Sequence, residues 1–387
     1  MCILESDLKH TNMKRLLKFI VSLLIIVIAA AAIIWLPEIR TIGSLKQVGD
    51  NQYLYSMDYH AHYDLDDVLA ANLGANKDLL NYVLHRVTRG IPVKLGNAGD
   101  VEKAGSFACT SFQAKNADGD GYFYGRNYDF FKNPTLVTAS HPRKGYASIS
   151  VSDMSHFGYS LEKLPDSFAG KLLSVASIYA PVDGINEKGL CTSIMALPNQ
   201  PAQQDNGKPI AGTTIIMRLW LDRCATVQEA LDLLETVDVR HDATAGSGYH
   251  YMVADANGDC AIVEFDLFDG WKTMVLRKPA GENSMLITNH LLNPKYYTTE
   301  PDPVYGNPHS KSWWRYETAG AYLAERNGTL SLDEAKECLS LVHWKDLKWD
   351  NGMVEDTQHS AVYDQSNPTL YLRSWYDWDT TEVFTLK

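Results

Sequence analysis

Two short segments, Ala108-Cys109-Thr110-Ser111-Phe112 and Gly125-Arg126-Asn127-Tyr128-Asp129-Phe130, lie on either side of the turn sequence Asp118-Gly119-Asp120-Gly121. Two β-prone runs around an Asp-Gly turn predict a β-hairpin. The first strand then begins with a cysteine, and the returning strand carries an arginine and a carboxylate. The hairpin would bring these three side chains close together in space.

The cysteine gains a base of its own if the chain is cut just before it. The α-amino group of a chain N-terminus has a pKa of about 7.7–8.0, so it can take the thiol proton at neutral pH. Arg126 would then lower the pKa of the Cys109 thiol, and Asp129 would hold the α-ammonium or a substrate amine. An ordinary surface Arg-Asp pair in a hairpin is the alternative interpretation.

The composition excludes several classes of function. The chain has 387 residues, enough for one large domain or two ordinary ones, and its 45% hydrophobic and 21% charged residues are typical of a globular core. The net charge of −12 argues against nucleic acid as a partner, because phosphate binding needs clustered Lys and Arg. No GxGxxG or Walker sequence is present, so we expect no nucleotide cofactor. The chemistry described above needs neither a metal ion nor an organic cofactor.

None of the six cysteines belongs to a CxxC pair, which argues against a zinc or redox motif. Cys191, Cys224, Cys260 and Cys338 lie in apolar surroundings and are predicted to be buried thiols. One disulfide is the alternative, and an extracytoplasmic location would permit it.

The N-terminal region predicts a membrane segment. Residues 19–36 carry no charge, and residues 16–36 would reach about 30 Å as a helix, enough to cross a bilayer. Basic residues precede this run, so we expect residues 1–15 to form a cytoplasmic tail, residues 16–36 a single-pass anchor, and the rest to be extracytoplasmic. A signal peptide cleaved near Ala30-Ala31-Ala32 is the alternative, with a secreted product.

The remaining chain divides at the cysteine. Residues 37–60 are expected to be a juxtamembrane connector, and residues 64–88 a helix interrupted near Gly74 and Asn76, within a helical leader over 37–108. Strands dominate the predicted catalytic domain, 109–387. They are expected at 109–115, 121–127, 147–152, 174–180, 189–195, 249–254, 260–265, 271–277, 284–288, 360–364, 369–374 and 382–386.

Helices are expected at 213–223, from Thr226 onward, at 313–326 and at 332–342. Thr226 with Glu229, and Ser331 with Glu334, have the spacing of capping boxes. Because helices and strands come in blocks rather than alternating singly, the order predicts an α+β protein with antiparallel sheets.

From Cys109 onward the sequence resembles the N-terminal-nucleophile (Ntn) hydrolases. More narrowly, it resembles the linear-amide C–N hydrolases, the family that includes choloylglycine (bile-salt) hydrolase, penicillin V acylase, acid ceramidase and the acyl-CoA:6-aminopenicillanic acid (isopenicillin N) acyltransferases. The matching pieces follow one another along 109–387. They are Cys109-Thr110-Ser111-Phe112, Gly125-Arg126-Asn127-Tyr128-Asp129, Asp183-Gly184-Ile185-Asn186-Glu187-Lys188-Gly189-Leu190, Ile287-Thr288-Asn289-His290, Trp314-Arg315-Tyr316 and Ser360-Ala361-Val362-Tyr363-Asp364.

The resemblance implies a four-layer αββα sandwich of antiparallel sheets and a role for each of five residues. Cys109 corresponds to the nucleophile, and Arg126 and Asp129 to the pair that supports it. Asn289 corresponds to the residue whose side-chain amide binds the oxyanion, and Arg315 to a late active-site arginine. The family's further asparagine falls here at Met195-Ala196, so a backbone N–H or Asn199 is expected to be the second oxyanion donor.

The long segment before Cys109 is similar to the leader of the acyltransferase and ceramidase branches. There a helical leader is cut off when the cysteine attacks its own preceding peptide bond, which here is Ala108–Cys109. The leader fragment 37–108 would then be retained as a small subunit or released. The function that we expect is a self-processing cysteine amidase that hydrolyses a linear amide through a thioester on Cys109. The alternatives are an acyltransferase that passes the acyl group to an amine and a catalytically silent, membrane-anchored binding domain.

Several other residues have two interpretations. His250, His290 and His359 offer a Cys-His pair of papain type, but His250 is expected to be a core histidine with satisfied hydrogen bonds. Asn186 is expected to shape a turn, and Asn327 to end a helix rather than to carry a glycan. Residues 116–121 predict a plain hairpin turn rather than a calcium loop. The aromatic residues Tyr296, Tyr297, Trp313 and Trp314 would line an acyl pocket or belong to the core.

Overall fold

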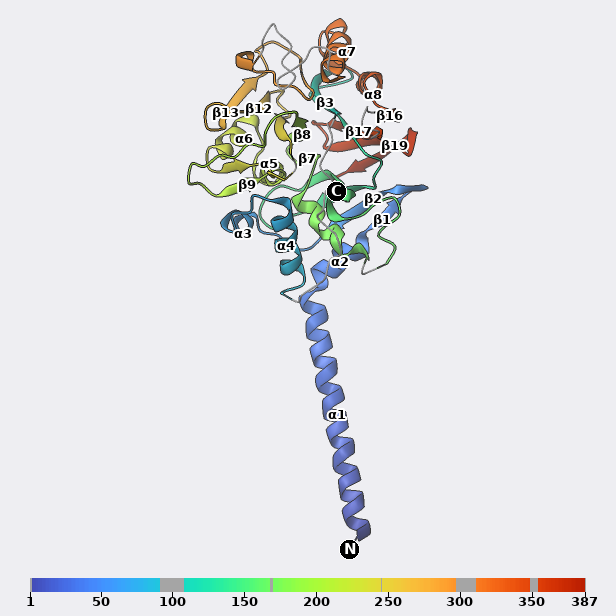
Figure 1. Ribbon diagram of the computed structural model, residues 1–387. Helices are drawn as coiled ribbons and strands as arrows, with labels where there is room; N and C mark the ends of the chain where they lie inside the picture. The colour runs from blue at the N-terminus through green and yellow to red at the C-terminus, as the bar shows by residue number, and fades with distance from the viewer. Residues whose placement is uncertain are drawn as a thin grey trace.

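The computed structural model describes residues 2–90, 108–167, 170–244, 246–296, 311–348 and 354–386, without the side chains of residues 2–12 and Ala31. Two large sheets face each other, and helices cover their outer faces (Figure 1). The structure is therefore α+β with two main sheets, in agreement with the prediction from the sequence.

The first sheet has nine strands in the order β1-β2-β5-β6-β7-β8-β11-β12-β13. Neighbouring strands are antiparallel, except that β2 and β5 run parallel. The strands are β1 (Lys46–Val48), β2 (Asn51–Tyr59), β5 (Thr135–Ser140), β6 (Ser148–Asp153), β7 (Asp183–Asn186), β8 (Cys191–Leu197), β11 (Gly248–Ala254), β12 (Cys260–Asp266) and β13 (Lys272–Arg277).

The second sheet contains the hairpin that opens with the cysteine. Its main order is β14-β3-β4-β17-β18-β19, with β15 beside β3 and β16 beside β17. The strands are β3 (Ala108–Asn116), β4 (Tyr122–Phe130), β14 (Ser284–Ile287), β15 (Thr329–Leu330), β16 (Leu347–Lys348), β17 (Val354–Asp364), β18 (Thr369–Ser374) and β19 (Asp377–Thr385). A separate two-stranded ladder joins β9 (Ile210–Gly212) and β10 (Asp238–Arg240). The predicted β3-β4 hairpin is confirmed, and Asn116 Oδ1 accepts the N–H of Asp118 at 2.8 Å within its turn.

Helices α5 (Ile215–Arg223) and α6 (Val227–Leu234) pack on the first sheet, and α7 (Lys311–Glu325) and α8 (Leu332–Leu341) pack on the second. Both predicted capping boxes are present, at the starts of α6 and α8. Asn327, at φ 50°, and Gly328 end α7, where the N–H of Gly328 donates to Leu323 O at 2.8 Å. The predicted helix cap is thus confirmed.

The segment before Cys109 differs from the expectation. The predicted break between two helices is confirmed by α3 (Leu65–Ala70) and α4 (Asn76–Val87). The predicted connector over 37–60 is wrong, because the chain there forms α2 (Leu36–Ser44), β1 and β2. β2 pairs with β5 from Leu54↔Thr135 to Tyr59↔Ser140, so the predicted helical leader also contributes strands to the first sheet. Residues 91–107 of that leader lie outside the described residues.

Two further predictions within the catalytic region are corrected. The strand predicted at 174–180 is wrong, because residues 174–179 belong to a 3₁₀ segment, Gly170–Tyr179, which is buried without strand partners. Asp183–Asn186, which the sequence predicts as a turn before the strand at 189–195, is the strand β7, and the turn follows it at 187–188. Strand β5 was not anticipated. Two other short 3₁₀ segments lie at Met154–Phe157 and Pro294–Tyr296.

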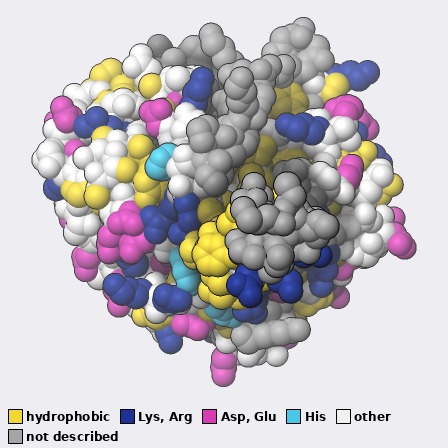
Figure 2. Space-filling model, turned by 90° about the horizontal axis from the view of Figure 1, so that it is seen from below, with side chains coloured by type: hydrophobic (Ala, Val, Ile, Leu, Met, Phe, Trp, Pro, Cys, Tyr) yellow, Lys and Arg dark blue, Asp and Glu magenta, His cyan; other side chains and the backbone are white. Residues whose placement is uncertain are grey.

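Helix α1 (Cys2–Ile34) projects from the body as a separate rod (Figure 1). Within it, Met13–Ile34 is the one helical segment among the described residues that is long and apolar enough to cross a membrane, and none of its most apolar window is buried. Seen from below, hydrophobic side chains gather near the middle of the face, with Lys and Arg around them (Figure 2). A membrane anchor and a signal peptide both have this character.

Candidate active site

Cys109 is the second residue of β3 and is 1% exposed, yet its side chain lines a cavity. In the β3-β4 register Cys109 lies opposite Tyr128, and Ala108 lies opposite Asp129. The backbone N–H of Asp129 hydrogen-bonds the thiol. Gly125 permits this close pairing, because a Cβ there would lie 2.4 Å from the ring of Phe112.

Two side chains hold the backbone of Cys109. Asn289 Oδ1 accepts the N–H of Cys109 at 2.5 Å, and the Asn289 Nδ2 group donates to Ala196 O at 2.7 Å. Arg315 Nη1 donates to the carbonyl oxygen of Cys109, and its Nη2 donates to Asn289 Oδ1 at 2.9 Å. Two residues that the sequence separates widely from the cysteine, Asn289 and Arg315, are thus brought into direct contact with it.

On the other side of the bond before Cys109, the N–H of Ala108 donates to Glu355 Oε1 at 2.7 Å. Glu355 lies on β17 and is 3% exposed. Both residues joined by the Ala108–Cys109 peptide bond are therefore fixed by side chains from other parts of the chain. Sequence reasoning missed Glu355, since it stands outside every family-like motif.

Arg126 is fully buried beside the cysteine. Its Nη2 donates to Ile194 O at 2.7 Å, its Nε lies 3.6 Å from Asp183 Oδ2, and its guanidinium lies 5.5 Å from the ring centre of Tyr128. Burial disfavours the cation, but the Cys109 thiol and Asp183 outweigh burial and raise the pKa of Arg126. The alternative of an exposed Arg-Asp pair is wrong, because Arg126 and Asp129 are both buried.

Asp183 is the acidic partner of Arg126 and was not predicted as a site residue. His359 Nε2 hydrogen-bonds Asp183 Oδ2 at 2.8 Å, and Tyr363 donates its hydroxyl to Oδ1. Burial alone would raise the pKa of Asp183, yet His359 and Arg126 lower it below its ordinary value. Asp183 is therefore ionised, and it forms a buried ion pair with Arg126.

Asp129 behaves differently, although Arg315 Nη1 lies 4.0 Å from its Oδ2. Thr357 donates its hydroxyl to Asp129 Oδ1 at 2.6 Å, whereas Oδ2 has no hydrogen-bond partner among the described residues. Burial is the main cause that raises the pKa of Asp129 to about 8, with Arg315 opposing and Glu355 adding to the shift. Burial has a larger effect on the pKa of Asp129 than the Arg315 cation has, so in the uncut chain Asp129 is mostly protonated at neutral pH.

The thiol itself is disfavoured as an anion. Burial raises the pKa of Cys109, and the nearby Arg126 and Arg315 only partly counter this. Cys191, Cys224, Cys260 and Cys338 are buried free thiols, as predicted. Burial raises their pKa values as well, and unlike Cys109 none of them lines the cavity.

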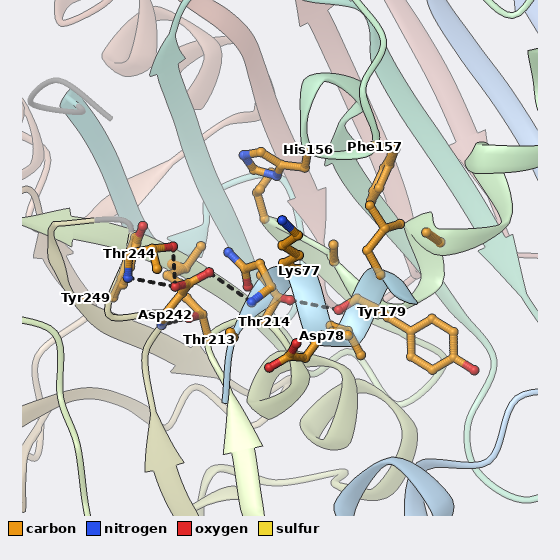
Figure 3. A pocket seen from close by; sticks show the side chains of 18 of the residues that line it. Lys77, Asp78, His156, Phe157, Tyr179, Thr213, Thr214, Asp242, Thr244 and Tyr249 are labelled. Carbon is orange, nitrogen blue, oxygen red and sulfur yellow. Dashed lines mark hydrogen bonds between the residues drawn. The ribbon is translucent and has the colours of Figure 1, made fainter. Parts of the chain in front are cut away.

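The cavity at Cys109 has a volume of about 490 Å³. One wall comes from α4 in the segment before Cys109, and the other walls come from the catalytic region (Figure 3). Its apolar lining includes Leu79, Leu80, Val83, Phe157, Ala176, Val182 and Ile194. Its polar lining includes Lys77, Asp78, His156, Thr213, Thr214, Asp242 and Tyr249. A mostly apolar cavity with a few polar groups suits an organic molecule that has both characters.

Some predicted residues lie elsewhere. Asn199 is 9% exposed, packs against Gly248 and does not line the cavity, although Ala196 does. Tyr296, Trp313 and Trp314 are also absent from the cavity lining, and Tyr297 lies outside the described residues.

The histidines and Asn186 have structural contacts. His250 is buried, and both of its ring nitrogens have hydrogen-bond partners. Its Nε2 lies 2.7 Å from Thr288 O and its Nδ1 lies 3.3 Å from Glu264 Oε1, so the predicted core histidine is confirmed. His290 Nδ1 contacts Ser312 Oγ at 2.9 Å. Asn186 donates to Leu221 O and Cys224 O and accepts two N–H groups of its own turn, as predicted for a turn residue. Among the residues that the structure describes, no group of three His, Cys, Asp or Glu is arranged to hold a metal ion.

Comparison with known proteins places this chain in a family. Residues 114–375 match the model of the acyl-coenzyme A:6-aminopenicillanic acid acyl-transferase family. The chain belongs to this family. Arg126, Asp129, Asn289 and Arg315 lie within the matched range, and Cys109 lies just before it.

The structure of this acyl-transferase family chain is similar to those of solved proteins. A mutant of the conjugated bile acid hydrolase from Clostridium perfringens superposes with a TM-score of 0.51 at 15% identity, over 72% of this chain and 92% of that one. Penicillin V acylase from Agrobacterium tumefaciens has a TM-score of 0.48 at 18% identity, over 71% and 84%. The chain has the Ntn-hydrolase fold.

An uncharacterized protein of Archaeoglobus fulgidus is 22% identical in an alignment of 355 residues that covers 83% of this chain and 52% of that protein. The present acyl-transferase family chain therefore spans about half the length of this relative.

Proposed function

We propose that the protein is a self-processing cysteine amidase with an αββα sandwich, in which Cys109 is the nucleophile. The observation that carries the proposal is the placement of Cys109, whose thiol lines an apolar cavity while its backbone nitrogen is held by Asn289. The layer order supports the fold, since α5 and α6 pack on one sheet and α7 and α8 on the other.

The reaction begins with a cut before Cys109, which frees its α-amino group. This amine takes the thiol proton, and the thiolate attacks the carbonyl carbon of a linear amide. The substrate amine leaves with a proton from the α-ammonium, and water hydrolyses the thioester. Arg126 stabilises the thiolate by its positive charge. Asp129 holds the α-ammonium, and this cation in turn stabilises the ionised form of the buried Asp129.

Asn289 has a donor to spare for the oxyanion. Its NH₂ group carries two hydrogens, and one donates to Ala196 O. The other has no partner among the described residues, and a donor fixed in this way can stabilise developing negative charge. Arg315 orients Asn289 through the contact between Nη2 and Oδ1. A backbone N–H supplies the second donor in this proposal, because Asn199 does not line the cavity.

The leader stays on the body as a small subunit after the cut. β2 contributes six paired residues to the first sheet, so its loss would expose the edge of β5. Asp242 Oδ2 accepts the N–H of Asn76 at the start of α4 at 2.9 Å, and Tyr63 donates its hydroxyl to Asp222 at 3.0 Å. Since α4 also forms a wall of the cavity, release of the leader would open the site.

Helix α1 acts in this proposal as an uncleaved single-pass anchor, with the catalytic domain extracytoplasmic. Its apolar side chains are exposed around the helix, which suits lipid contact. Trp35 Nε1 donates to Val87 O at 3.0 Å, so the foot of the anchor is tied to the end of α4. Recovery of residue 2 or 3 at the N-terminus of membrane-extracted material would support an anchor, and a start after residue 32 would contradict it.

The acceptor of the acyl group is water in this proposal. The family name favours a second candidate, in which an amine resolves the thioester. Incubation with an N-acyl amide panel, with and without added amines, separates the two by the mass of the product. A free acid in the presence of amine supports the amidase, and a new amide supports the acyltransferase.

Intact-mass measurement of the detergent-solubilised full chain tests the whole proposal. We expect two fragments that meet at Ala108–Cys109, together with hydrolysis of at least one linear amide. A single uncut chain in catalytically active material would contradict the mechanism. An uncut chain without activity would instead favour a silent binding domain.

A further inference from the structure

The contacts around the Ala108–Cys109 bond fall into two groups, one on each side of the proposed cut. Asn289 and Arg315 hold Cys109, which stays in the catalytic fragment when the bond is cut. Glu355 holds the N–H of Ala108, which belongs to the leader once the bond is cut. The contacts of Asn289 and Arg315 therefore stay within the catalytic fragment, whereas the contact between Glu355 and Ala108 lies on the leader side of the bond.

Glu355 reaches Ala108 from a distant part of the sheet. In the register of the second sheet, Ala108 lies opposite Asp129, and Asp129 lies opposite Thr357 on β17. Glu355 lies two residues before Thr357, so its side chain extends toward the far strand β3 to meet the Ala108 N–H at 2.7 Å. A carboxylate is a stronger acceptor for an N–H than a neutral group, and it fixes the direction of that N–H.

Glu355 also lies close to a second acidic group. It is 3% exposed, and its charge adds to the burial that raises the pKa of Asp129. Two buried acidic groups near one peptide bond oppose each other's ionisation. Of the two, Glu355 is the group that accepts the Ala108 N–H, next to the Ala108–Cys109 bond.

We propose that Glu355 is a positioning residue for self-cleavage and has no part in amide turnover. By fixing the Ala108 N–H it holds the Ala108 carbonyl group in place for Cys109 Sγ. The sulfur bonds to the Ala108 carbonyl carbon, the C–N bond to Cys109 breaks, and the thiol proton goes to the departing nitrogen. Water then hydrolyses the thioester, which leaves a carboxylate on Ala108 and a free thiol on Cys109. The inference rests on the proposed function above.

The test compares full-length wild type with Glu355→Gln and Glu355→Asp, and follows cleavage by intact mass over time. We expect Glu355→Gln to slow cleavage by about 10- to 100-fold, because the charge of the acceptor is lost. Glu355→Asp keeps the charge but shortens the reach, so it should also cleave slowly, and it serves if the glutamine variant fails to fold. The kcat and KM for amide hydrolysis, counted per cleaved chain and taken at the maximum of each pH profile, should equal those of wild type, because the loss of the Glu355 charge shifts only the pH dependence through Asp129.

Asp255→Asn is the matched control, since Asp255 is a buried carboxylate that accepts a backbone N–H, that of Val227, away from Cys109. It should lower stability without slowing cleavage of folded chains. Wild-type cleavage rates in both Glu355 variants would overturn the inference, and so would reduced turnover per cleaved chain. If wild type itself is never cut, the proposed function fails instead, which is a distinct result.

Discussion

Asn289 accepts the backbone N–H of Cys109 through its side-chain oxygen, and this fixes which end of its amide faces the cysteine. The same oxygen accepts Nη2 of Arg315, and the nitrogen end donates to Ala196 O. A single side chain thus joins the backbone of Cys109, a buried cation and the strand β8. We expect the arrangement to persist when the N–H becomes an amine.

Replacing Asn289 should impair both cleavage and turnover. Asn289→Ala leaves the Cys109 N–H and Arg315 Nη2 without this acceptor, which costs about 1–3 kcal/mol for each buried group left unpaired. We expect amide turnover to fall by at least about 100-fold, in the range for the loss of an oxyanion donor. Asn283→Ala is the matched control, because its side chain contacts only an exposed backbone carbonyl, Asn327 O. Normal kinetics in Asn289→Ala would remove it from the site.

Cys109→Ala should abolish both cleavage and amide hydrolysis, since no other thiol lines the cavity in the part of the chain that the structure describes. The drop in kcat should exceed about 10³-fold, because removal of a catalytic nucleophile costs up to about 10⁶. Cys109→Ser should retain slow cleavage, as a hydroxyl is the weaker nucleophile. Cys338→Ala, which removes another buried thiol, should behave like wild type. Amide turnover that survives in Cys109→Ala would show that the nucleophile lies elsewhere.

Cleavage should depend on pH through Asp129. Burial raises the pKa of Asp129 to about 8, so this group is protonated at lower pH and gains charge as the pH rises through that value. The charged form can accept the thiol proton before an α-amine exists, and the rate should therefore rise between about pH 6 and pH 8. In Asp129→Asn only the Cys109 thiol is left to titrate, and burial raises the pKa of that thiol above 9.0. The pH profile of cleavage by this variant should therefore move to higher pH. Superimposable profiles for the two proteins would exclude Asp129 as the base.

Asp183→Asn should destabilise the protein by about 3–5 kcal/mol, because it leaves buried Arg126 without its anionic partner. The folded-state pKa of Asp183 lies below its ordinary value of 3.8, so its contribution is present above that pH and is lost as the pH falls further. Measured in the uncut Cys109→Ala chain, which is expected to refold, the gap in urea midpoint between the chains with and without Asp183→Asn should accordingly be large at pH 7 and shrink in strong acid. Asp222→Asn, which breaks the buried pair with Arg218, should destabilise without slowing cleavage of the folded chain. Equal urea midpoints at pH 7 would contradict this account.

The sequence predicted the elements whose signals are local. The β3-β4 hairpin follows from its Asp-Gly turn, and the starts of α6 and α8 follow from their capping boxes. The strand β2 escaped prediction because its stability comes from pairing with β5, far along the chain, and no local pattern encodes a parallel partner. The 3₁₀ segment Gly170–Tyr179 was mistaken for a strand because a short buried apolar run has the same composition in both states.

The site was predictable only where a motif existed. Cys109, Arg126, Asp129, Asn289 and Arg315 come together in the structure, although their catalytic roles stay predictions. Asp183 was quoted only as part of a family-like segment, and its contact with Arg126 depends on a sheet topology that the sequence does not show. Glu355 and the α4 wall of the cavity carry no sequence signal, because each acts through contacts between segments far apart in the chain.

The strand β2 lies on the leader side of the cut, inside a sheet that the catalytic fragment cannot complete alone. Before the cut, the two parts find each other as one molecule, with only the cost of closing a loop. Afterwards they would have to meet as separate molecules, which costs translational and rotational freedom. We therefore expect the mature protein to be stable kinetically, because it unfolds slowly, and not through a reversible folding equilibrium. Denatured mature material should refold poorly on dilution, whereas the uncut Cys109→Ala chain should regain its structure.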